Sequence, residues 1–114
     1  MKKVTLTCAH AIVKYLIAQK ILIDGKKEPL FPGVFGIFGH GNVACLGQAL
    51  EENQKDLPTY RGHHEQNMAL TGIGYARGKR RQQIFVATSS VGPGATNMVT
   101  AAAVAMSNRL PILF

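Results

Sequence analysis

One carboxylate in this chain, Glu65, stands between two histidines and a stretch with helical periodicity. The stretch is predicted to be a buried helix from Glu65 to Gly78, because small and apolar residues recur in it every three or four positions: Ala69, Gly72, Ile73 and Ala76. Glycines inside a helix cost about 1 kcal/mol each relative to alanine, so we expect Gly72 and Gly74 to let another backbone approach closely. A carboxylate in a first turn also complements the helix dipole, which requires no catalytic role.

Three histidines lie beside turns and are candidates for proton transfer or metal binding. His40 follows Gly39, and His63 and His64 directly precede Glu65. Histidine titrates near neutral pH, which suits proton transfer. Adjacent histidines point in different directions and no second ligand pair has the spacing of a zinc site, so we predict no metal site in these residues. A serine in a G-x-S-x-G turn, the sign of one class of nucleophile, is not found in the sequence.

The elements that must position these residues alternate between strands and helices. Short runs rich in β-forming residues predict buried strands at 34–38 and 84–88, a short strand at 59–61, and a further strand from Leu110. Helices are predicted after a cap at Thr5 or Thr7, around residues 43–50, at 65–78, and at 95–107, the last buried on most sides; residues 23–29 are predicted to be a polar turn. This alternation predicts an α/β fold, an open parallel sheet with helices on both faces.

Three loops would meet at the carboxyl ends of the strands, where open parallel sheets bind ligands. They are residues 39–42, 61–65 and 89–97. The first contains Gly39-x-Gly41-x-x-Ala44, which fits the dinucleotide-binding fingerprint. That fingerprint also requires an acidic residue about 20 positions further on, at the end of the second strand, to hold the ribose of the dinucleotide. Here the second strand ends at Arg61, whose positive charge would suit a ribose 2′-phosphate. A nicotinamide-binding domain therefore stays open as an alternative.

The formal charge of +7 over 114 residues raises the question of an anionic partner. The densest cationic run, residues 77–81, lies between a predicted helix and a predicted strand and has no interleaved aromatic residues. We therefore expect a solvated turn and no nucleic-acid binding, with a basic interaction module as the non-enzymatic alternative.

Cysteine content and hydropathy bear on the compartment. Cys8 and Cys45 fall in predicted helices and are expected to be reduced, buried thiols. Neither a membrane-length apolar stretch of about 20 residues nor a secretory signal is recognisable, so a cytoplasmic protein without a membrane partner is expected. Residues 110–114 read as a core strand with no polar tail, which predicts that residues 1–114 are a fragment truncated within or just after that strand.

Two of the three loops resemble motifs of thiamine diphosphate enzymes of the acetolactate synthase type. Residues 64–66, with the helix end at 74–78, resemble the glutamate helix of that family. Residues 87–97 resemble its glycine-proline-glycine loop, with one residue inserted. The two motifs keep the family's order and separation, and the match covers essentially the whole chain. The resemblance implies that residues 1–114 are the N-terminal part of a pyrimidine-binding domain, without the diphosphate-binding domain.

The resemblance also implies roles for individual residues. Glu65 would hydrogen-bond N1′ of the cofactor's aminopyrimidine and favour the imino tautomer, which removes the proton from C2 of the thiazolium. The residues expected along the pyrimidine are Gly92, Pro93, Gly94 and Asn97. A carboxylate that shares a proton with a heterocycle needs a water-poor setting that raises its pKa toward neutrality, so we expect such a setting around Glu65.

Within the family, the loop at residues 39–42 departs from that of acetolactate synthases. It resembles the branch that hydrolyses a cyclic 1,2-dione in myo-inositol catabolism, with an acetolactate synthase or carboligase as the alternative. His40, Asn42 and His64 would then face the small-molecule substrate. Diphosphate and Mg²⁺ would be held by a later domain, usually supplied by a partner subunit of a homodimer or higher oligomer, so the chain alone is expected to be inactive.

Overall fold

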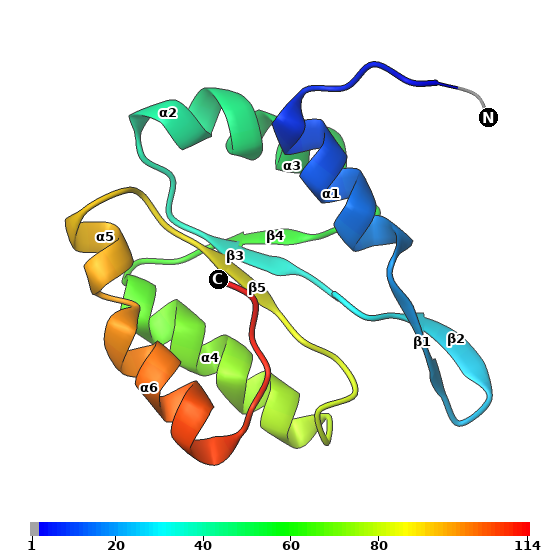
Figure 1. Ribbon diagram of the computed structural model, residues 1–114, viewed down its shortest axis with the longest axis vertical. Helices are drawn as coiled ribbons and strands as arrows, with labels where there is room; N and C mark the ends of the chain where they lie inside the picture. The colour runs from blue at the N-terminus through cyan, green and yellow to red at the C-terminus, as the bar shows by residue number, and fades with distance from the viewer. Residues whose placement is uncertain (1–2) are drawn as a thin grey trace.

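A three-stranded parallel sheet forms the centre of the computed structural model, which describes residues 3–114. The strands are β3 (Val34–Gly36), β4 (Thr59–Arg61) and β5 (Val86–Thr88), in the spatial order β4-β3-β5 (Figure 1). Three of the four predicted strands are present, although the two residues expected at the end of β3 and the two expected at the start of β5 lie outside these strands. The predicted α/β class with a parallel sheet is confirmed.

Helices cover both faces of the sheet (Figure 1). One face carries α1 (Cys8–Ala18) and a continuous helical segment made of α2 (His40–Asn42), the π-helical turn η1 (Val43–Gly47) and α3 (Gln48–Glu52). The other face carries α4 (Glu65–Gly78), the short α5 (Pro93–Thr96) and α6 (Val99–Asn108). The predicted layering is therefore confirmed.

Alternation along the strands divides the interior into two cores. Val86 of β5 faces the first core, whereas the next residue, Ala87, faces the second. The first core contains the most deeply buried large side chains, which are Val13, Val34, Leu50 and Leu57. The second core is built of smaller residues from α4, β5 and α6, namely Ala69, Ile73, Ala87, Ala101 and Ala105. Small side chains bring α4 and α6 close together, and α4 begins with Glu65.

The first predicted helix is present and capped as expected. The Oγ1 atom of Thr7 accepts a hydrogen bond of 3.2 Å from the backbone N–H of His10. Its buried residues are Val13 and Leu16, as the periodicity predicts. Ile12 of the same helix is exposed, although its side chain is large and apolar.

The polar turn predicted at 23–29 is confirmed at Asp24 and Gly25 but is wrong for residues 26–29, which form a strand of a β-hairpin. Strands β1 (Lys20–Ile23) and β2 (Lys26–Pro29) pair antiparallel, with Ile23 opposite Lys26. The two residues between them, Asp24 and Gly25, have φ angles of 51° and 78°. An Asp-Gly pair with positive φ at both positions forms the two-residue turn that matches strand twist.

The predicted single helix at 95–107 is also wrong. It divides into α5 and α6 at Asn97 and Met98, and only Ala101 and Ala105 of α6 are buried within the described chain. Val99 and Met106 are exposed. The strand expected from Leu110 is reduced to one parallel bridge, between Leu113 and Val86.

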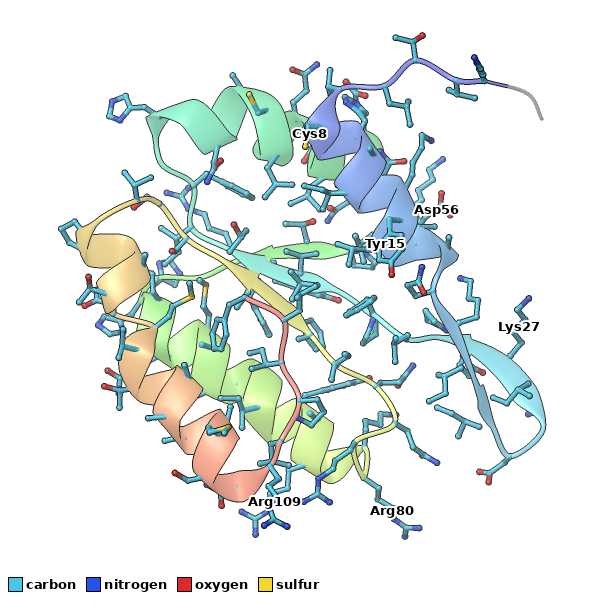
Figure 2. All side chains as sticks on the ribbon, in the orientation of Figure 1. Cys8, Tyr15, Lys27, Asp56, Arg80 and Arg109 are labelled. Atoms are coloured by element: carbon cyan, nitrogen blue, oxygen red, sulfur yellow. The ribbon has the colours of Figure 1, made fainter. Side chains whose placement is uncertain are left out.

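Two predictions about small side chains need correction as well. Cys8 and Cys45 are exposed rather than buried: Cys8 is the first residue of α1 (Figure 2), and Cys45 lies within η1 on a side that the described chain leaves uncovered. A Cβ atom on Gly72 would lie 3.2 Å from Cβ of Phe85 and 3.1 Å from Cδ1 of Ile112, so Gly72 admits side chains and not another backbone. Gly74 has open space around its Cα within the described chain.

Candidate functional site

The loops after β3 and β5 touch each other at the carboxyl edge of the sheet. The side-chain amide of Asn42 donates a hydrogen bond of 3.3 Å to the backbone carbonyl of Ser89. Gly39 lies against Ser90, because a Cβ atom on Gly39 would come within 2.6 Å of Cβ of Ser90. The two loops therefore hold each other in place, and the glycine at position 39 permits the contact.

Glu65 is the first residue of α4 and lies half-buried at this same edge. The preceding residue, His64, has extended backbone angles, so the chain enters the helix directly from the loop that follows β4. The Nδ2 atom of Asn97 donates a hydrogen bond of 3.1 Å to Oε2 of Glu65. Two predicted site residues, 32 positions apart in the sequence, are thus brought into direct contact.

Gly94 lies beside the other oxygen of the same carboxylate. Gly94 is buried, and a Cβ atom at this position would come within 3.0 Å of Oε1 of Glu65 and 2.6 Å of Oγ of Ser90. Only a residue without a side chain fits between these two oxygens. Gly92 starts the turn with a φ of 63°, and Pro93 occupies the first position of α5, where its fixed φ suits a helix start.

The hydrogen bond from Asn97 lowers the pKa of Glu65 below its ordinary value of 4.5. The backbone N–H of Glu65 itself and the neighbouring His64 lower this pKa further, and partial burial opposes them. The predicted pKa-raising setting is therefore wrong for this chain. The reason is that donors surround the carboxylate while the described residues leave it partly open to solvent.

Two of the other predicted site residues, His40 and Asn42, line a neighbouring cavity of about 310 Å³, whereas the third, His64, is exposed at the N-cap of α4 and does not line it. Asn42 is half-buried there, and His40 is exposed at its rim. Ser90 and Val91 form the opposite wall. Because Ser90 also abuts Gly94, this cavity adjoins the Glu65 carboxylate. Ser90 was not predicted as a site residue, although the inserted residue in the glycine-proline-glycine loop was the signal that pointed to it.

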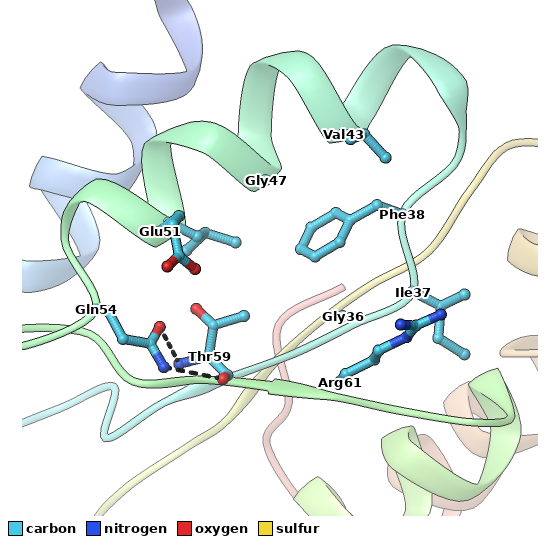
Figure 3. A pocket seen from close by; sticks show the side chains of 10 residues that line it. Gly36, Ile37, Phe38, Val43, Gly47, Glu51, Gln54, Thr59 and Arg61 are labelled. Atoms are coloured by element: carbon cyan, nitrogen blue, oxygen red, sulfur yellow. Dashed lines mark hydrogen bonds between the residues drawn. The ribbon is translucent and has the colours of Figure 1, made fainter.

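A larger cavity of about 390 Å³ lies elsewhere, between the helical segment that contains α3 and strand β4 (Figure 3). Glu51 and Arg61 enter it from opposite sides, and Phe38 lines its apolar part. Glu65 is not among its lining residues. The carboxylate site is therefore distinct from this cavity.

Neither a metal-ligand cluster nor a membrane-spanning helix lies within residues 3–114. No group of three or more histidine, cysteine, aspartate or glutamate residues is placed to hold a metal ion. No helix within this range is both long and apolar enough to cross a membrane.

The fold and the site together define an α/β domain that presents one oriented carboxylate against a glycine-rich loop. This chain belongs to the thiamine pyrophosphate enzymes: the family model described as the N-terminal TPP binding domain matches residues 7–114. The match includes Gly39–Ala44, so the loop that resembles a dinucleotide fingerprint lies within a thiamine pyrophosphate-binding domain.

Curated relatives are similar over nearly the whole chain. A 3D-(3,5/4)-trihydroxycyclohexane-1,2-dione hydrolase of Geobacillus thermodenitrificans is 53% identical over 113 residues, which is 99% of this chain and 18% of that protein. Proteins of the same name from Clostridium tetani and Listeria innocua are 50% and 49% identical over the same coverage. The chain thus spans 18% of the length of these relatives.

Proposed function

We propose that this chain supplies the cofactor-activating glutamate of a thiamine diphosphate-dependent hydrolase that opens the ring of a trihydroxycyclohexane-1,2-dione. The observation that carries the proposal is the oriented carboxylate of Glu65, held by Asn97 and adjoined by Gly94. The names of relatives that are about half identical support the substrate and the hydrolytic reaction.

The residues present fit the aminopyrimidine end of the cofactor. A carboxylate oxygen is the acceptor that a protonated ring nitrogen requires. The missing side chain at Gly94 leaves room beside Oε1 of Glu65, where a larger residue would intrude. Gly92 and Pro93 shape the turn that presents Gly94. By the family resemblance, diphosphate and Mg²⁺ would bind outside residues 1–114, on a domain of a partner subunit.

When bound, thiamine diphosphate acts as an electron sink for cleavage of a bond next to a carbonyl carbon. Glu65 accepts and holds a proton at its carboxylate. The polar side chains of the adjoining cavity, His40 and Asn42, bind and orient the hydroxyl and carbonyl groups of the substrate, with His64 beside Glu65 as a proton donor or acceptor. The overall reaction breaks one ring C–C bond and adds one water, which leaves a carboxylic acid at one end and an aldehyde at the other.

The test uses the full-length protein. Acid release from the cyclic dione is followed with and without thiamine diphosphate and Mg²⁺. Turnover that requires the cofactor supports the proposal. Turnover of pyruvate to acetolactate without turnover of the dione would replace the hydrolase with the carboligase alternative, and dione turnover without cofactor would overturn the role of Glu65.

A further inference from the structure

We propose that Asn97 is a positioning residue that orients the Glu65 carboxylate through Oε2, so that Oε1 is the oxygen presented toward the cofactor. This inference rests on the proposed function of Glu65. It assigns Asn97 a partner within the chain, in place of the direct contact with the pyrimidine that the sequence resemblance implies.

The backbone around Asn97 is fixed well enough to serve this purpose. Asn97 ends α5, and its own backbone N–H donates to the carbonyl of Pro93 at 3.0 Å. The preceding residue, Thr96, bonds the carbonyl of Gly92 through both its N–H and its hydroxyl, at 3.0 and 3.1 Å. These hydrogen bonds to Gly92 and Pro93 fix the backbone of the turn, and the side-chain amide of Asn97 contacts α4 from this turn.

The two oxygens of Glu65 have different surroundings, and this difference gives the carboxylate a direction. Oε2 receives the amide of Asn97. Oε1 lies beside the bare Cα of Gly94, with Oγ of Ser90 on the far side of that glycine. Among the described residues, no other side chain donates a hydrogen bond to Oε1, so this oxygen keeps its acceptor capacity for a ligand.

The amide of Asn97 does not itself titrate, so its hydrogen bond favours the ionised form of Glu65 until the carboxylate takes up a proton in acid. The ionisable side chains on the segments around Glu65 are His63 and His64 before α4, His40 on the loop after β3, and Arg61, which enters the separate cavity between α3 and β4. The loop 89–92 and α5 carry none. A pH effect that depends on Asn97 can therefore be separated from the histidines by substituting Asn97 alone.

The experiment uses the full-length holoenzyme with Asn97→Ala and the isosteric Asn97→Asp. Two quantities are measured: the affinity for thiamine diphosphate by calorimetric titration, and the pH profile of kcat/KM. We expect cofactor affinity to fall about tenfold in Asn97→Ala, the scale of a lost hydrogen bond to a charged group. We expect the acidic limb of the profile to move to higher pH, and to move further in Asn97→Asp, where a second carboxylate faces Glu65.

Asn108→Ala is the matched control, since Asn108 is an exposed asparagine whose amide bonds only the carbonyl of Val104 on its own helix. Its affinity and pH profile should equal those of the wild type. Wild-type affinity and an unmoved acidic limb in both Asn97 variants would overturn the inference. A loss of affinity without any movement of the limb would also overturn it, because that pattern indicates direct cofactor contact or a structural role.

Glu65→Gln separates this inference from the proposed function. An inactive Glu65→Gln together with unaltered Asn97 variants rejects the role of Asn97 alone. An active Glu65→Gln rejects the proposed function of Glu65, and the positioning role with it. Thermal unfolding of each variant identifies any that fails to fold, and the Asp substitution preserves the shape of the side chain if alanine does not.

Discussion

Gly94 and Glu65 approach each other so closely that a single methyl group on Gly94 would lie 3.0 Å from Oε1 of the carboxylate. The same methyl group would lie 2.6 Å from Oγ of Ser90. The glycine therefore keeps open the space between a loop hydroxyl and a helix carboxylate, at the edge where the proposed cofactor binds.

Gly94→Ala is predicted to lower thiamine diphosphate affinity by about tenfold or more, because the added Cβ must push Ser90 or Glu65 aside, and overpacking costs about 1–3 kcal/mol. The measurement is calorimetric titration of the full-length protein. Gly74→Ala is the control, since its Cβ meets open space on the same molecule. Equal affinity in Gly94→Ala and wild type would show that the contact is not required.

The two glycines inside α4 make a matched pair for stability. Gly74→Ala should stabilise α4 by about 1 kcal/mol through helix propensity alone. Gly72→Ala should lose that gain or destabilise the helix, because its Cβ would press on Phe85 and Ile112 at 3.2 and 3.1 Å. Hydrogen exchange of peptides from residues 65–78 reports the local opening free energy of both variants. Identical protection in the two variants would contradict the packing described here.

Arg81 closes the carboxyl end of α6. Its Nε donates a 2.9 Å hydrogen bond to the carbonyl of Arg109, which is the C-cap of that helix. Both Arg80 and its neighbour Arg81 have positive φ angles, of 53° and 65°. Arg80 extends from the same end of the molecule as Arg109 (Figure 2). Arg80→Gly should therefore stabilise the fold by about 1 kcal/mol, because it relieves backbone strain. Arg81→Gly should stabilise the fold by less, because it also removes the side-chain hydrogen bond to the C-cap of α6.

Hydrogen exchange of peptides from α6 distinguishes the two arginines. Protection should fall in Arg81→Gly relative to Arg80→Gly. Equal protection would show that the cationic side chain contributes nothing to the end of α6.

The stability supplied by the Asn97–Glu65 hydrogen bond should depend on pH. The pKa of Glu65 is lower in the folded chain than its ordinary value of 4.5, so the folded state favours the ionised form. The stabilisation is then fully present above the ordinary pKa and is lost as pH falls through the lowered one. The difference in hydrogen-exchange protection between wild type and Asn97→Ala, measured at residues 65–78, should be largest near neutral pH and vanish in acid. A difference that persists unchanged in acid would contradict an ionic hydrogen bond.

Local patterns were sufficient to predict the parallel sheet and the helix that begins at Glu65. Short apolar runs predict the buried strands, and apolar residues at helical spacing predict the helix. Both patterns follow from burial, so several residues in each element carry the same signal. The hairpin of β1 and β2 was missed because β2 is polar and carries no apolar alternation, although Asp24 and Gly25 carried the turn signal.

The contacts that define the site could not be predicted from local patterns. Asn97 meets Glu65 only because α5 ends where α4 begins, which is a property of the assembled sheet. For the same reason the sequence indicated a raised pKa for Glu65, whereas the donors found around it lower that pKa. The exposure of Cys8 and Cys45 likewise depends on which helix faces remain uncovered in the described chain.

The most direct test of the central claim is the activity of Glu65→Gln in the full-length protein, measured as cofactor-dependent opening of the cyclic dione. Glu51→Gln is the matched control, because Glu51 lies in the separate cavity between α3 and β4. We predict that Glu65→Gln lowers kcat by at least about a hundredfold, the usual scale for loss of an acid–base group, while Glu51→Gln retains wild-type activity. Wild-type turnover in Glu65→Gln would contradict the account.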